Sequence, residues 1–127
     1  MPRMFGAVAM CVSMAVGSMA CDEDRQPVVC TAIAVSSLVV TVRDAETRQR
    51  VCDATVTAMQ AGTTYSLRAV GDAASCTYSG PEEKPGLFEV HAARAGYEPA
   101  SMSNVRVNAD ECHVIPVHLT LDLRQSP

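Results

Sequence analysis

Residues 85 to 97 read Pro-Gly-Leu-Phe-Glu-Val-His-Ala-Ala-Arg-Ala-Gly-Tyr. The Pro-Gly pair at the start is typical of a turn. Beyond it, Phe88, Val90 and Ala92 alternate with the residues between them, the period of two that predicts a half-buried β-strand. We expect Gly96 to let the backbone bend, and the ring of Tyr97 to pack on the core while its hydroxyl stays in water. The segment therefore predicts a turn, a strand and a corner.

Other segments show the same alternation, and none after the N-terminal region has a convincing helical period. Together with the strand above they predict seven short strands at a spacing of about ten residues, which favours an all-β sandwich of two sheets. Because Pro116 has no backbone N–H, we expect the last strand to begin at an edge or a bulge. The other predicted strands cover residues 33–43, 52–59, 65–69, 76–78, 105–107 and 117–123.

The N-terminal segment has the features of a secretory signal peptide. Arg3 precedes an apolar run, and the small-residue stretch 17–20 ends at Cys21. We predict that residues 1–20 are removed on export. A membrane anchor that is never cleaved is the alternative, but a transmembrane helix needs about 20 apolar residues and this run is shorter.

Residues 18–21, Ser-Met-Ala-Cys, resemble the lipobox of bacterial lipoproteins, in which the cysteine receives a diacylglycerol thioether. The resemblance implies that Cys21 is lipidated and becomes the mature N-terminus. An ordinary signal-peptidase cut near Ala20, which would leave a soluble secreted protein, remains the alternative. We expect residues 21–31 to form a tether and residues 32–127 to form one domain.

Composition excludes several function classes. The chain has 127 residues, a net charge of −4, one lysine and no basic cluster. Nucleic-acid binding depends largely on neutralising phosphates, so we expect no nucleic-acid partner. The absence of tryptophan weakens a sugar-binding interpretation. The sequence indicates no cofactor.

Three segments carry a resemblance to a known family: residues 39–47, Val-Val-Thr-Val-Arg-Asp-Ala-Glu-Thr; residues 52–56, Cys-Asp-Ala-Thr-Val; and residues 85–90 with the Gly96-Tyr97 corner. Residues 36–123 resemble the carboxypeptidase regulatory-like domain, which implies a transthyretin-like topology of two sheets with parallel first and last strands. The activities of relatives do not carry over. Metallocarboxypeptidases need a separate zinc peptidase domain, and transthyretin-like hydrolases end in Tyr-Arg-Gly-Ser, whereas this chain ends Arg-Gln-Ser-Pro.

Apart from Cys11 in the signal peptide and Cys21, four cysteines remain, which allow three disulfide pairings. The implied topology places the starts of the first and last strands at one end of the sandwich. It therefore predicts Cys30 with Cys112 at that end and Cys52 with Cys76 at the other. A zinc site that includes His113 is the alternative, but structural zinc sites use closely spaced ligand pairs and these cysteines are far apart.

No segment carries a known catalytic motif such as G-x-S-x-G, H-E-x-x-H or a glycine-rich phosphate loop. We expect His91 and His118 to be half-exposed sheet residues and His113 to cap a strand end. The carboxylates of loops 44–46, 82–83 and 110–111 are better explained as solvated turns than as calcium ligands, because calcium needs six to eight converging oxygens.

These observations predict a non-catalytic, lipid-anchored protein of the bacterial cell envelope that faces the periplasm or the cell surface. We expect it to act as a structural or protein-binding module, attached to the membrane through its lipid and contacting an envelope protein whose identity the sequence does not give. A soluble secreted protein that binds small molecules or forms homo-oligomers, by analogy with transthyretin, is the alternative. A hydrolase that uses His91 or His118 is a third hypothesis.

Overall fold

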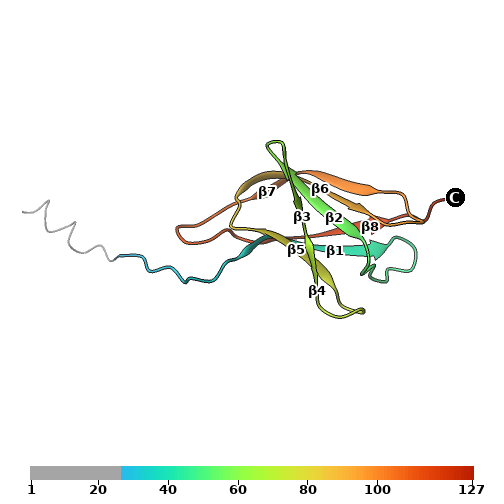
Figure 1. Cartoon of the computed structure of the whole chain (residues 1–127), viewed down its shortest axis with the longest axis horizontal. Coiled ribbons are helices and arrows are strands. Elements are labelled where there is room, and N and C mark those ends of the chain that lie inside the picture. The colour runs from blue at the N-terminus through green and yellow to red at the C-terminus, as the bar shows by residue number, and fades with distance from the viewer. Residues whose placement is uncertain (1–26) are drawn as a thin grey trace, which may run out of the picture.

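The structure is a computed structural model, and it describes residues 27–127. Within these residues eight β-strands form two four-stranded sheets, and there is no helix. Figure 1 shows the two sheets as layers, with the chain entering at one end of the molecule. The strands are β1 (Ser36–Asp44), β2 (Thr55–Gln60), β3 (Thr63–Ser66), β4 (Arg68–Val70), β5 (Thr77–Glu82), β6 (Gly86–Ala93), β7 (Ala100–Val107) and β8 (Val117–Leu123).

The two sheets have the strand orders β4-β5-β1-β8 and β3-β2-β6-β7. The first and last strands, β1 and β8, pair in parallel, with Leu38 opposite Val117 and Asp44 opposite Leu123. The other pairings between these strands are antiparallel. As Pro116 predicts, β8 lies at an edge of its sheet.

The core lies between the sheets, where alternate residues of the central strands point inward. Leu38, Val40 and Val42 of β1 are fully buried, and Phe88 and Val90 of β6 face them from the other sheet with at most 2% exposure. The burial of Phe88 and Val90 confirms the alternation predicted for their strand, and β1 shows the same period of two. The other buried apolar residues of the cluster are Val51, Val56, Ala58, Leu67, Tyr78, Ala92, Val105, Val107, Val114, Leu121 and Leu123.

The number of strands differs from the prediction, because residues 63–70 form two strands where one was expected. β3 pairs with β2 in one sheet, and β4 pairs with β5 in the other. At the crossing, the N–H of Leu67 donates to the carbonyl of Val56 at 2.9 Å, and the Leu67 side chain is buried. The chain therefore passes from one sheet to the other at a single residue that still faces the core.

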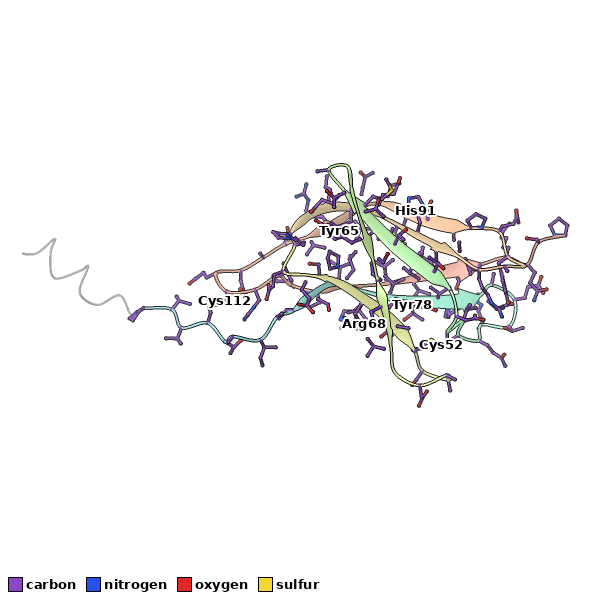
Figure 2. The ribbon with its side chains drawn as sticks, in the orientation of Figure 1. Cys52, Tyr65, Arg68, Tyr78, His91 and Cys112 are labelled. Carbon is purple, nitrogen blue, oxygen red and sulfur yellow. A yellow bond between two sulfur atoms is a disulfide. The ribbon has the colours of Figure 1, made fainter. Side chains whose placement is uncertain are left out.

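Two disulfides join the pairs that were expected. Cys30 and Cys112 have their Cα atoms 5.2 Å apart, and Cys52 and Cys76 have theirs 5.7 Å apart. Figure 2 shows Cys112 near the end where the chain enters and Cys52 toward the opposite end. The predicted signal peptide and the lipidation site Cys21 lie outside the described residues. No helix in the part of the chain from residue 27 onward is long and apolar enough to span a bilayer.

Candidate functional site

Three chain segments that are distant in the sequence meet where the chain enters the domain. They are the entering segment (residues 30–35), the β5–β6 turn (residues 83–85) and the β7–β8 loop (residues 108–116). The Cys30–Cys112 disulfide joins the first segment to the third, and Figure 1 shows the β7–β8 loop at the same end as the entering chain. We call this junction the tether junction.

Glu83, in the β5–β6 turn, is hydrogen-bonded to both of the other segments. Its Oε2 accepts hydrogen bonds from Nδ1 of His113 at 2.5 Å and from the N–H of Val35 at 3.0 Å, and its Oε1 accepts from the N–H of Val114 at 3.1 Å. These donors stabilise the ionised carboxylate, His113 foremost, and lower the pKa of Glu83 below its usual range. Glu83 is therefore held as an anion that orients the imidazole.

The turn that carries Glu83 is itself fixed by backbone contacts. The N–H of Glu83 donates to the carbonyl of Val35 at 2.9 Å, and the next N–H, of Lys84, donates to the hydroxyl of fully buried Ser37 at 2.9 Å. Glu83 has a φ of 53°, in the left-handed region that few residues other than glycine adopt. The start of β1 therefore determines where the Glu83 carboxylate lies.

His113 is positioned from both sides of its ring. Its Nδ1 meets Glu83, and its Nε2 lies 2.9 Å from Oγ1 of Thr31. Because the ionised carboxylate only accepts hydrogen bonds, Nδ1 must carry a proton. In the neutral ring Nε2 is then free to accept the Thr31 hydroxyl proton. The result is a chain of hydrogen bonds that runs from hydroxyl to imidazole to carboxylate.

Asp110 shapes the loop that presents His113. Its Oδ1 accepts hydrogen bonds from the N–H groups of Cys112 at 2.8 Å and His113 at 2.9 Å, and these bonds lower the pKa of Asp110. The N–H of Asp110 donates back to the carbonyl of His113 at 2.9 Å. This tight turn explains how the sequence places His113 directly after the disulfide with a fixed backbone.

An open hollow of about 450 Å³ lies at the tether junction. The Thr31, Glu83 and His113 side chains line it, together with apolar groups of Ile33 and Pro85. The imidazole is only 20% exposed, whereas Thr31 is an exposed residue. The hydroxyl is therefore accessible to a molecule in the hollow while the imidazole behind it is largely shielded.

No family model matches this chain, and no curated protein sequence matches it either. The candidate site is therefore assigned on the geometry of its own residues.

A second polar cluster lies around Asp44, at the far end of β1. Asp44 is 5% exposed and accepts hydrogen bonds from the N–H of Glu46, the N–H of Thr47, the Tyr97 hydroxyl and the Gln125 amide, at 2.7 to 3.1 Å. These donors, the N–H of Thr47 first, hold the pKa of Asp44 far below its usual range. The Tyr97 hydroxyl, which was expected to stay in water, donates to this carboxylate.

The other two histidines lie on outer faces of the sheets. His91 is partly exposed on β6, and its Nε2 is 2.8 Å from Oε1 of Glu89, whose Oε2 accepts a hydrogen bond from Ser103. His118 is exposed on β8. His91 is thus half-exposed as expected, and His118 is more exposed than expected. In the described residues no hydroxyl is hydrogen-bonded to either ring.

The structure also bears on the metal hypotheses. Cys30, Cys52, Cys76 and Cys112 are all engaged in disulfides, so none of them is available as a thiolate ligand for zinc. Among residues 27–127, no three His, Cys, Asp or Glu side chains gather as metal ligands would. The loop carboxylates instead accept hydrogen bonds from backbone N–H groups, as Asp110 and Asp72 do.

Thr31 was not expected as a site residue, and Glu83 was expected only as a solvated turn carboxylate. A signal for Thr31 was present: Thr31 follows Cys30, and His113 follows Cys112. The predicted pairing of these cysteines therefore also predicts that the hydroxyl and the imidazole lie close together. No comparable signal marked Glu83, whose carboxylate reaches the site through a turn between two other strands.

Proposed function

We propose that this chain is a lipid-anchored module of the bacterial cell envelope, with a structural or protein-binding role. The N-terminal segment supports export, and the sequence around Cys21 supports lipidation. Two disulfides are compatible with an oxidising compartment, where such bonds form and persist. The acidic balance of the chain favours a protein partner over a nucleic acid.

The observation that carries this proposal is the tether junction. Cys30 lies only nine residues beyond Cys21, and its disulfide ties the entering chain to the β7–β8 loop. In a lipidated protein, the membrane-attached end would therefore be joined to the domain at two points, through the chain that enters β1 and through this covalent bond to the loop before β8. Such an arrangement suits a module that is held at a surface and bears load there.

The proposal includes a fold family. The parallel pairing of β1 with β8 and the two four-stranded sheets support a transthyretin-like topology of the carboxypeptidase regulatory-like type. The crossing at Leu67 adds one strand to the seven that this resemblance implies. The fold family favours a structural or protein-binding module and does not indicate which partner the module binds.

The test is the intact mass of the protein purified from detergent-solubilised envelopes, with alkylation under non-reducing conditions. We expect a chain that begins at Cys21, carries added acyl mass and has no alkylated thiol. A chain cut near Ala20 with one alkylated thiol would overturn the anchor. That outcome would favour the soluble secreted alternative, and sedimentation would then show whether the protein forms a homo-oligomer.

A further inference from the structure

We propose that Thr31 is a nucleophile that accepts acyl groups from carboxylic esters, with His113 as its general base and Glu83 as the residue that positions the base. This activity goes beyond the proposed role of the chain as an anchored module and does not depend on lipidation. The array is the one found in nucleophilic catalysis: a hydroxyl within hydrogen-bond reach of a base, and the base oriented by a third group.

The hydrogen bonds set the direction in which protons move. The Glu83 carboxylate, with backbone N–H donors at 3.0 and 3.1 Å, remains ionised and keeps the proton of the imidazole on Nδ1. The opposite nitrogen, Nε2, lies 2.9 Å from Thr31 Oγ1 and is the proton acceptor. Glu83 also stabilises the imidazolium that forms when His113 takes the hydroxyl proton.

The disulfide holds the two reacting side chains together. Thr31 and His113 each follow one of its cysteines, so the Cys30–Cys112 bond fixes their backbones side by side. A hydroxyl on an unrestrained chain segment would otherwise sample many positions away from the imidazole. Preorganisation of this kind is a large part of what an intramolecular base contributes.

The surroundings of Thr31 define the substrate class. The hollow is open, so it admits a small ester without any movement of the chain. The Glu83 and Asp110 carboxylates line it and disfavour an anionic substrate. Ile33 and Pro85 add apolar surface for a short acyl group. We therefore expect uncharged or cationic esters of short carboxylic acids to react.

The reaction proceeds in two balanced steps. The Thr31 oxygen attacks the carbonyl carbon while its proton passes to Nε2 of His113. The tetrahedral intermediate then expels the alcohol, which takes up that proton, and leaves the acyl group as an ester on Thr31. Water next attacks this ester with His113 again as the base, which releases the carboxylic acid and restores the Thr31 hydroxyl.

The experiment exposes the full chain, purified in detergent without reductant, to p-nitrophenyl acetate and maps acetylation by mass spectrometry. Treatment with hydroxylamine distinguishes acetyl esters, which it cleaves, from acetylated amines, which it leaves. We expect a hydroxylamine-sensitive acetyl group on Thr31 and a release of p-nitrophenol that accompanies its formation. Position 31 should carry no acetyl group in Thr31→Val and should be acetylated again in Thr31→Ser.

Matched variants separate chemistry from folding. His113→Gln should lower the rate of acylation about 100-fold, the loss typical of a missing general base. His91→Gln, which removes a histidine that also pairs with a glutamate, and Thr64→Val, which removes an exposed threonine of β3, should leave the rate unchanged. The melting temperature and the absence of free thiols are checked for every variant.

Three results would overturn the proposal: no acetyl ester on Thr31, equal labelling of Thr31 and Thr64, or an undiminished rate in His113→Gln. If His113→Gln fails to fold, the comparison of Thr31→Val with Thr31→Ser still tests the proposal. Thr31 is exposed and lies ahead of β1, so we expect both of these variants to fold. A failure here leaves the anchored module untouched, since that proposal is tested by the acyl mass on Cys21.

Discussion

Removal of the Cys52–Cys76 disulfide should destabilise the protein more than removal of Cys30–Cys112, although its loop is much shorter. The two variants are Cys52→Ala/Cys76→Ala and Cys30→Ala/Cys112→Ala. The closed loops span 24 and 82 residues. On the chain-entropy model these lengths correspond to about 3.4 and about 4.5 kcal/mol of lost stability. Loop length alone therefore predicts the opposite order.

The native state reverses this order, because only one of the bonds has an end that is free to fray. Cys30 lies in an exposed segment ahead of β1, and without its bond residues 30–34 regain freedom in the folded protein. At roughly 1 kcal/mol for each of these residues, the gain of about 5 kcal/mol cancels the loop contribution. The net cost that remains is about 1 kcal/mol, from the one hydrogen bond lost between Thr31 and His113.

Removal of the Cys52–Cys76 bond releases no comparable chain segment in the folded protein. Cys76 is 3% exposed and directly precedes β5, and Cys52 follows buried Val51. Both ends stay fixed by the sheets after the sulfurs are removed, so we expect nearly the full cost of about 3 kcal/mol.

Urea titration of both variants under identical conditions measures the two free energies of unfolding. In thermal unfolding, 1 kcal/mol corresponds to about 4–8 °C for a domain of this size, so the Tm should fall by roughly 12–24 °C for Cys52→Ala/Cys76→Ala and about 4–8 °C for the other variant. If the Cys30→Ala/Cys112→Ala variant is the less stable of the two, the fraying argument is refuted, and the entering segment is a stable part of the domain.

Three further substitutions test other parts of the structure. Tyr78→Phe should lower the free energy of unfolding by about 1–3 kcal/mol in urea titrations, because the buried hydroxyl bonds two backbone groups at 2.8 and 2.9 Å. Gly86→Ala should cost about 1–3 kcal/mol by the same assay, since its φ is 121° and a Cβ would lie 2.6 Å from the Gln60 amide. The pKa of Asp44 is lowered in the folded state, so its ionised carboxylate stabilises the fold above the unfolded pKa of about 4, and this stabilisation is lost as the pH falls below that value. In Asp44→Asn, the urea midpoint should therefore decline less steeply in acid than it does in the unsubstituted protein.

Alternation in the sequence was enough to predict which faces of the strands are buried, but not which strands pair. Leu38, Val40 and Val42 are buried as their period of two requires. Tyr65 and Leu67 also alternate, yet between them and Ala69 the chain changes its hydrogen-bonding partner from β2 to β5. The alternation runs on to Ala69, which is exposed on β4, so the side-chain period carries no trace of the change of sheet.

The tether junction was predictable only in part, for a related reason. The disulfide pairing followed from topology, and it carried Thr31 and His113 with it. Glu83 depends on something that no spacing shows, namely the path of the β5–β6 turn over the start of β1. Its carboxylate is one of several in loops, and only the three-dimensional path of the turn distinguishes it from the others.

The two polar clusters at the ends of β1 differ in whether an oxygen remains available. At Asp44, four donors engage both carboxylate oxygens of a residue that is 5% exposed, so the carboxylate is saturated and its hydrogen bonds hold the corner at Tyr97. A hollow of about 330 Å³ lies there too. At the tether junction, Thr31 donates its proton to His113 while its oxygen faces an open hollow. A hydroxyl oxygen keeps accepting capacity when it donates. The Tyr97 hydroxyl also keeps this capacity, but it donates to a saturated carboxylate, whereas Thr31 donates to an imidazole that can take its proton. For that reason we assign the candidate site to the tether junction.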